Sequence, residues 1–253
     1  MRKPLSYRHR GYRGRCQAEG LVTFTTRVEE SDLHIIADAD AQETARERLL
    51  FYRGQLERYI DRRPEFLTAL SPISDDPLAP IIIRAMLKAA ALADVGPMAA
   101  VAGAVAECVG RDLLAGGLGE VAVENGGDIF LARKKDALVE IFAADSPHSG
   151  RMAVKIIAAD MPVGLCTSSA SIGHSLSFGK ADAATVVADS AALADAAATR
   201  LGNMVSPSKG PDCGIAAALQ EILTIKGLRG ALAICGQLFG AAGAIELVGL
   251  SAP

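Results

Sequence analysis

The chain has 253 residues, 50% of them apolar, and a formal net charge of −3 at pH 7. This length suffices for one large domain or two small ones with a hydrophobic core, and the charge balance does not favour nucleic acid as the partner of the whole chain. Aromatic residues make up 4% and tryptophan is absent, while alanine and glycine are abundant. Such a composition favours close packing of helices on a sheet over large aromatic pockets.

Residues 1–18 form a basic N-terminal arm. The charged residues in its first part are all basic: Arg2, Lys3, Arg8, Arg10, Arg13 and Arg15. A short arm of this kind either contacts phosphate groups or is a solvated tail. We expect the solvated tail, and therefore no nucleic-acid partner.

The cysteines are spread widely and show no Cys-x-x-Cys or Cys/His ligand spacing: Cys16, Cys108, Cys166, Cys213 and Cys235. This distribution argues against a disulfide framework and against a structural zinc site. No apolar run follows the basic arm as it would in a secretory signal, and none approaches the length of a transmembrane helix. We therefore expect reduced thiols, a cytoplasmic protein and no membrane partner.

In chain order, the first half of the sequence alternates between strand and helix patterns. It predicts strands at 21–29 and 33–38, a helix ending before Pro64, a Pro- and Asp-rich connection at 72–80, and Ala-rich helices at 81–93 and 98–115. The connection at 72–80 is the candidate subdomain seam.

The second half is rich in strands. It predicts strands at 120–124 and 128–132 around an Asn-Gly turn, then 137–143, 152–159 and 182–188, a helix capped by Ser190, a helix at 215–223, and a closing hairpin of 231–235 with 244–250. Consecutive strands joined by short turns, with the helices grouped between strand blocks, favour an α+β fold with an antiparallel sheet over a doubly wound parallel fold.

The helix after Ser190 carries the first candidate site. Asp195 and Thr199 are four residues apart, so their side chains leave the same face of the helix. A carboxylate and a hydroxyl on one face make a hard-oxygen half-site that suits Mg²⁺, although the same spacing also occurs on solvated helix edges.

Two glycine-containing segments are candidate ligand-binding groups. Residues 101–103 are small and lie early in a predicted helix, where a backbone can closely approach either a ligand or another helix. Residues 124–128 contain the Asn-Gly turn. Its adjacent glycines, Gly126 and Gly127, can present backbone N–H groups to a phosphate or a ring edge, or can simply close a hairpin.

Residues 166–175 place several hydroxyls ahead of His174 at a predicted sheet end. Hydroxyls and backbone amides there can bind a pyrophosphate, and His174 can act as an acid or base. The alternative is a polar surface loop. Nucleophilic serine catalysis is not favoured, because no G-x-S-x-G elbow is present.

In this order the segments resemble the ApbE-like family of flavin transferases. The family's small-residue helix, GGD hairpin, TSG strand end, histidine segment and ADALAT helix have counterparts at 100–103, 126–128, 167–169, 173–176 and 194–199. The resemblance covers residues 95–205, and the helix motif at 194–199 is its most specific part. A short cytosolic branch of the family, with the pattern CTSS…GHSLSFGKAD, is the most similar.

The resemblance implies a T-fold-like α+β domain over residues 19–253, with FAD and Mg²⁺ as cofactors. It also implies transfer of FMN from FAD to a hydroxyl of an acceptor protein, with release of AMP. Asp195 and Thr199 would be metal ligands, joined by a backbone carbonyl near Val101, and Asp195 and His174 would be catalytic. The flavin nucleotide would lie against Asn125, Gly126, Gly127, Asp128, Thr167, Ser168, Ser169 and Ser175.

Two departures from the family pattern leave the function open. Ala102 replaces the lysine of the small-residue helix, and a shorter stretch at 176–180 replaces the DPRTG extension. One function is Mg²⁺-dependent cleavage of FAD, with FMN passed to a hydroxyl acceptor or to water. The other is a non-catalytic flavin- or purine-binding accessory protein linked to sulfur metabolism. The Ala-rich helices and a sheet edge are compatible with a homo-oligomer.

Overall fold

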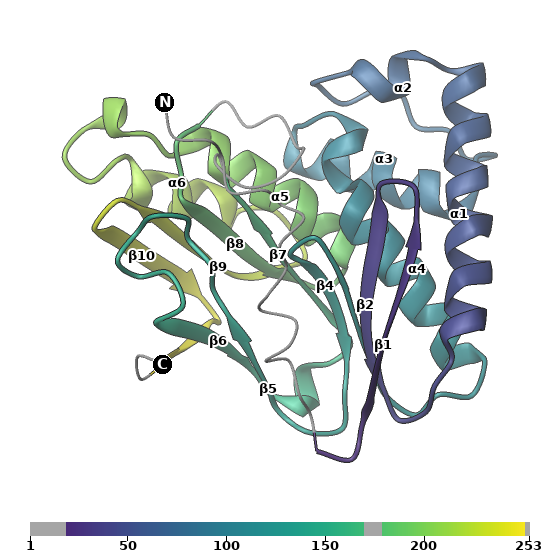
Figure 1. Cartoon of the computed structure of the whole chain (residues 1–253). Coiled ribbons are helices and arrows are strands. Elements are labelled where there is room, and N and C mark those ends of the chain that lie inside the picture. The colour runs from purple at the N-terminus through teal and green to yellow at the C-terminus, as the bar shows by residue number, and fades with distance from the viewer. Residues whose placement is uncertain (1–18, 170–178, 251–253) are drawn as a thin grey trace.

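The computed structural model describes residues 19–169 and 179–250, whose strands form two antiparallel sheets (Figure 1). The larger sheet has the order β1-β2-β3-β4-β7-β8-β9-β10 and the smaller has the order β11-β6-β5. The strands are β1 (Val22–Val28), β2 (Ser31–Ala37), β3 (Val121–Asn125), β4 (Asp128–Ala132), β5 (Ala137–Glu140), β6 (Met152–Ile156), β7 (Val163–Ser168), β8 (Ala183–Ala188), β9 (Leu228–Cys235), β10 (Leu238–Gly243) and β11 (Glu246–Gly249). The antiparallel α+β prediction is confirmed.

The α-helices are α1 (Gln42–Arg62), α2 (Glu65–Thr68), α3 (Ile81–Ala93), α4 (Val101–Ala115), α5 (Ala191–Met204) and α6 (Ile215–Ile222). Short 3₁₀ turns lie at η2 (Pro97–Ala100), η3 (Ala158–Asp160) and η4 (Pro207–Lys209). Helices α3, α4 and α5 pack against one another, and α4 and α5 lie on the large sheet. The helices at 81–93 and 98–115 are thus confirmed, apart from a 3₁₀ turn at the start of the second.

The large sheet separates two hydrophobic cores. On its helix side, Phe130 packs in one cluster with residues of α3, α4 and α5, such as Leu201. On its other side, the next residue, Leu131, packs in a second cluster with residues of the small sheet, such as Val154. Successive side chains of a strand point to opposite faces, so β4 contributes to both cores. The result is a three-layer arrangement of helices, large sheet and small sheet.

The Asn-Gly hairpin forms as predicted. Asn125 of β3 pairs with Asp128 of β4, and the two residues between them have positive φ: Gly126 at 71° and Gly127 at 109°. A two-residue turn with positive φ at both positions matches the twist of the flanking strands, and glycine adopts it without steric cost. The turn therefore fixes the register of β3 and β4.

Two strand predictions need correction. Residues 163–168 form β7 in the middle of the large sheet, whereas the sequence analysis predicts only a sheet end near 166–169 and gives no strand that leads to it. The predicted closing hairpin is wrong: β9 pairs with β10 across Gly236, which has a φ of 62°. Residues 246–249 instead pair with β6 in the small sheet. The left-handed turn at Gly243 (φ 83°) separates β10 from that last strand.

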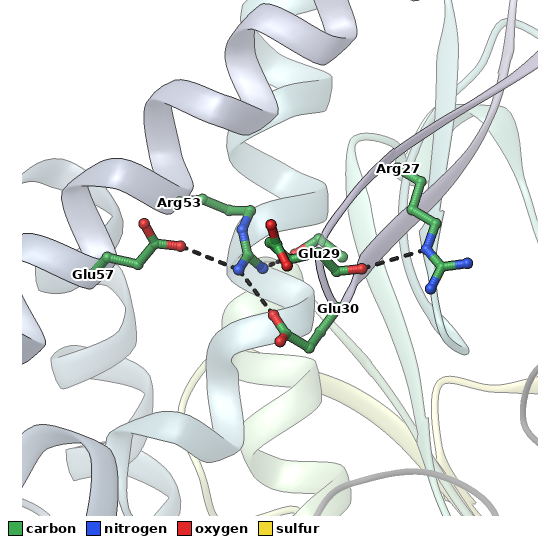
Figure 2. Close-up of polar contacts among 6 residues, drawn as sticks. Arg27, Glu29, Glu30, Arg53 and Glu57 are labelled. Carbon is green, nitrogen blue, oxygen red and sulfur yellow. Dashed lines mark hydrogen bonds and ion pairs between the residues drawn. The ribbon is translucent and has the colours of Figure 1, made fainter.

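Arg53 of α1 forms polar contacts with the β1–β2 hairpin (Figure 2). Its guanidinium donates a 2.9 Å hydrogen bond to Ser31 Oγ and forms ion pairs with Glu30 at 2.9 Å and Glu57 at 3.1 Å. Both carboxylates are exposed, so each pair contributes about 1 kcal/mol or less. The turn itself places Glu29 in the left-handed region, with a φ of 52°. Together these contacts hold the edge of the large sheet against α1.

Two sequence predictions fall outside these observations. The basic arm 1–18 lies outside the described residues, and the single domain with a seam at 72–80 stays a prediction. The 72–80 connection contacts α1, because Tyr59 Oη donates a 3.0 Å hydrogen bond to Asp76. Within the described part of the chain, no single helix has the length and apolarity needed to cross a membrane.

Candidate functional site

Helix α5 presents Asp195 and Thr199 inside the molecule. Ser190 caps the helix as predicted, since its hydroxyl accepts a hydrogen bond from the amide of Leu193 at 3.5 Å. Asp195 is only 8% exposed and Thr199 only 7%. Their neighbours at 191–198 are mostly buried alanines, so the carboxylate and the hydroxyl are polar groups in an otherwise apolar part of the helix.

The Asp195 carboxylate lies at the N-terminus of α4. Its Oδ2 accepts a 2.9 Å hydrogen bond from the amide of Gly103, the third residue of that helix. The first amides of a helix have no partner within the helix, so Asp195 satisfies one of them from a different helix. Val101, the first residue of α4, is half-buried next to this contact. The structure thus brings residues 101–103 together with Asp195, as the sequence suggests.

A second carboxylate, Asp128, faces Asp195 from the sheet. It begins β4 and is paired in register with Cys166 of β7. Burial, followed by the charge of Asp195, raises the pKa of Asp128 well above its ordinary value. Burial also raises the pKa of Asp195 to about 7, although the amides of Gly103 and Ala102 oppose this shift. The buried Asp195 carboxylate and the half-buried Asp128, whose pKa the charge of Asp195 raises, are two neighbouring acidic groups that a cation would complement.

Cys166 is a further component of this cluster. Its thiol donates a 3.3 Å hydrogen bond to the carbonyl of Ala191 at the start of α5. Burial, then the charges of Asp128 and Asp195, raise the pKa of this thiol well above its ordinary value. It is therefore a neutral thiol at pH 7 and not a nucleophile. The sequence could not reveal its place, because that depends on the register of the unpredicted strand β7 against β4.

The β3–β4 turn is hydrogen-bonded to the N-terminal turn of α4. Asn125 Nδ2 donates a 3.2 Å hydrogen bond to the carbonyl of Ala102. The amide of Gly127 donates a 2.9 Å hydrogen bond to Oε1 of Glu124. These bonds place the glycine turn beside the first turn of α4. The predicted residues 125–128 and 101–103 thus lie together.

The hydroxyl residues of β7 divide between the two faces of the sheet. Thr167 Oγ1 lies 2.9 Å from Thr185 Oγ1, on the face opposite Cys166. Its backbone amide hydrogen-bonds to Asp128. Ser168 points to the helix side, where a Cβ on Gly202 of α5 would lie 3.6 Å from its hydroxyl. Ser169 follows and is half-buried. The other two predicted residues, His174 and Ser175, lie outside the described ranges.

The oxygen donors of the cluster suit a hard cation that is completed by a ligand. Within residues 19–169 and 179–250, no group of three His, Cys, Asp or Glu side chains forms a ready metal site. Mg²⁺, however, is usually held by one or two carboxylates together with waters and phosphate oxygens of a substrate. Asp128, Asp195 and the Thr199 hydroxyl supply donors of this kind. The arrangement therefore fits a cation shared with a phosphate ligand, and not a closed protein cage.

Known proteins are similar to this chain in sequence and in fold. A family model described as "AbpE bacteria" matches residues 13–241. A UPF0280 protein of Methanocaldococcus jannaschii is 39% identical over 231 residues, which cover 89% of this chain and 93% of that protein. A UPF0280 protein of Methanococcus aeolicus is 38% identical over 221 residues, which cover 86% and 88% of the two chains.

Solved structures give the same result for the fold. The apo crystal structure of the Pseudomonas stutzeri flavinyl transferase ApbE has a TM-score of 0.56 and 17% identity, covering 88% of this chain and 94% of that one. The flavin transferase ApbE from Vibrio cholerae has a TM-score of 0.52 and 13% identity, covering 88% and 97%. At these identities the likeness shows the fold alone, which confirms the ApbE-like prediction. Together with the family model and the sequence relatives, it shows that the chain belongs to the ApbE-like proteins and, among them, to the UPF0280 family.

Proposed function

We propose that this chain binds a flavin nucleotide with Mg²⁺ and cleaves FAD, passing FMN to a hydroxyl of an acceptor protein or to water. The observation that carries the proposal is the pair formed by Asp195, which is buried at the N-terminus of α4, and the half-buried Asp128 of β4. In a fold shared with flavin transferases, this pair gathers the predicted segments at 101–103, 125–128 and 194–199 around one point.

Each group in the cluster has a role in this proposal. Asp195 and Thr199 would hold the cation, together with Asp128 of β4 and the backbone near Val101. When bound there, Mg²⁺ would neutralise charge on the pyrophosphate oxygens and polarise the bond to be broken. We assign the amide of Gly126 and the hydroxyls of Ser168 and Ser169 to the flavin nucleotide. The Thr167 hydroxyl pairs with Thr185 on the other face of the sheet, so Thr167 would contribute through its backbone alone.

The reaction exchanges one phosphorus–oxygen bond for another. The acceptor oxygen bonds to the phosphorus on the flavin side, the bridging P–O bond breaks, and AMP leaves with the bonding electron pair. The acceptor hydroxyl loses its proton to a general base, a role that we assign to His174, which also lies in the motif segment next to Ser175. When water is the acceptor, the products are FMN and AMP.

We also propose a compartment and partners for the protein. The four cysteines in the described ranges are all free thiols, as expected for a protein of the cytoplasm. A cytoplasmic enzyme would act on an acceptor protein, or on water, without a membrane partner. Self-association into a homo-oligomer also remains a proposal.

The test is incubation of the purified protein with FAD and Mg²⁺, with AMP and FMN separated by chromatography. Asp195→Asn removes the carboxylate charge with little change of shape. The expected loss of turnover exceeds the roughly 10–100-fold that loss of an outer-shell partner of a metal costs. Asp94→Asn is the matched control. Asp94 is an exposed carboxylate at the end of α3, and it pairs at 3.5 Å with Arg200 of α5, the helix that carries Asp195. Unchanged AMP release in Asp195→Asn would refute the proposed site.

A second function is favoured by one observation. Ala102 stands where the resembling family has a lysine, and its carbonyl is occupied by Asn125. A site without that cation is suited to holding a flavin or purine nucleotide for a partner enzyme, for example in sulfur metabolism, without turning it over. Stoichiometric flavin binding without AMP release would support this accessory role, and measurable turnover would exclude it.

A further inference from the structure

One carboxylate oxygen of Glu107 in α4 accepts two hydrogen bonds from the start of α5. Its Oε2 accepts hydrogen bonds from Ser190 Oγ at 2.8 Å and from the amide of Ala191 at 2.7 Å. Its Oε1 pairs with Arg111, one turn further along α4. The Glu107 side chain is only 12% exposed. Such shielded, charge-assisted hydrogen bonds are stronger than neutral ones, and the negative charge meets the positive end of the α5 dipole.

The two helices touch through their backbones one turn before Glu107. A Cβ on Gly103 would lie 2.1 Å from the carbonyl oxygen of Ala191 and 2.9 Å from Cβ of Asp195. Gly103 and Glu107 are four residues apart on α4, and their partners Asp195 and Ala191 are four residues apart on α5. The matched spacing means that two polar contacts, one turn apart, join the same stripe of each helix.

Small residues dominate the closest approach of the two helices. The residues of α5 around Asp195 are alanines, and α4 presents glycine at the closest approach. Helix packing obtains its register from side-chain ridges that fit into grooves. Where those ridges are small, the helices approach closely, but sterics set their relative position less firmly. Directional hydrogen bonds then have to fix the register.

We infer that Glu107 is a positioning residue that sets the register of α5 on α4 and so holds the Asp195 carboxylate at the Gly103 amide. Its contact with α5 is through Ser190 and Ala191, and it acts on the site only through the helix. The consequence for metal binding rests on the proposed function, whereas the consequence for the Gly103–Asp195 bond does not.

The test compares Glu107→Ala with Glu107→Gln. The alanine variant removes both hydrogen bonds to α5. In the glutamine variant, the amide oxygen can take the place of Oε2 and accept both bonds, whereas the negative charge and the ion pair with the half-exposed Arg111 are lost. Two readouts are needed: hydrogen exchange of the Gly103 amide, relative to that of Val186 in the buried strand β8, and the Kd for Mn²⁺ in the presence of FAD.

In Glu107→Ala we expect the Gly103 amide to exchange at least about tenfold faster relative to Val186, and the Mn²⁺ Kd to rise about 10–100-fold. Glu107→Gln should stay close to wild type in both. Tyr52→Phe is the control: it removes the 2.8 Å bond from Tyr52 to Asp112 at the far end of α4. It should lower stability without changing either readout.

The outcomes separate the inference from the proposed function. Unchanged relative exchange at Gly103 in Glu107→Ala would overturn the positioning role. A glutamine variant as impaired as the alanine variant would also overturn it, because both bonds to α5 survive in glutamine. Faster exchange at Gly103 in a protein that binds no Mn²⁺ even as wild type would support the positioning role and count against the proposed metal site.

Discussion

The Asp195 carboxylate accepts a 2.9 Å hydrogen bond from the amide of Gly103, a residue 92 positions earlier in the chain. The bond joins two helices whose backbones touch at the same point, since Gly103 has no side chain to hold them apart. Glycine at position 103 therefore meets two requirements: it allows α4 and α5 to pack closely, and it brings its amide within reach of the Asp195 carboxylate. The close approach permits the hydrogen bond, and the hydrogen bond orients the carboxylate.

Gly103→Ala should damage both stability and the site. The added Cβ would lie 2.1 Å from the carbonyl oxygen of Ala191, a backbone atom that cannot rotate away. Overpacking of this kind costs about 1–3 kcal/mol, and separation of the helices would lengthen the bond to Asp195. Urea denaturation should show the lowered midpoint. A wild-type midpoint would mean that α4 and α5 separate without cost.

Gly54→Ala should act in the opposite direction. Gly54 lies inside α1, and the added Cβ would lie 3.1 Å from Nη1 of Arg58, the far end of a flexible side chain. Replacing a glycine inside a helix by alanine stabilises by about 0.5–1 kcal/mol when nothing obstructs it. The same urea experiment should show a raised midpoint. A lowered midpoint would show that Arg58 cannot move aside.

Tyr52 should make stability fall at alkaline pH. Burial, and then the hydrogen bond to Asp112, raise its pKa above the ordinary value of 10.0. Below that value the phenol is protonated in both the folded and the unfolded chain, so its contribution is complete. Above it, the unfolded chain loses the proton while the folded chain keeps it, and the free energy of unfolding decreases as pH rises.

Tyr52→Phe should therefore have two measurable effects. Loss of the hydrogen bond should lower the free energy of unfolding by about 1 kcal/mol below pH 10. The decline of stability above pH 10 should also become shallower than in wild type. Urea denaturation at a series of pH values measures both. Parallel alkaline slopes in the two proteins would show that another group causes the decline.

The fold was predictable where local signals were strong. The Asn-Gly turn fixes β3 against β4 because both intervening glycines adopt positive φ. The sequence pattern does not predict strand β7, because the short run after Pro162 contains Gly164 and does not alternate apolar with polar residues. The prediction of the last hairpin is wrong because residues 246–249 pair with β6, a distant partner that no local pattern identifies.

The site was predictable only in outline. The motif resemblance indicated that residues 101–103 and Asp195 belong together, and the structure joins them. Cys166 and Glu107 could not be assigned from the sequence. The place of Cys166 depends on the β4–β7 register, and that of Glu107 depends on how α5 packs on α4. Both relationships are tertiary.

The half-buried Cys108 and the buried Cys235 should resist alkylation in the folded protein. Burial raises the pKa of Cys108 and that of Cys235 to about 12. Near pH 8 only about one such thiol in ten thousand is ionised, and the thiolate is the reactive form. Iodoacetamide should modify both cysteines about 1,000-fold or more slowly than in the denatured chain. Peptide mapping measures this, and equal rates would mean that these thiols are not enclosed.

Asn125 should couple the glycine turn to the cation side of the site. Asn125→Ala removes the 3.2 Å bond to the Ala102 carbonyl and should cost about 1 kcal/mol of stability. Asn125→Asp should cost more, because a carboxylate has no proton to donate and would repel both that carbonyl and Asp128. Gln237→Ala, in the exposed turn between β9 and β10, is the control. If the turn binds the flavin nucleotide, fluorescence titration should rank FAD affinity as control, then alanine, then aspartate. Equal affinity in all three would show that the turn does not contribute to flavin binding, because the bond from Asn125 to the Ala102 carbonyl would then have no influence on the ligand.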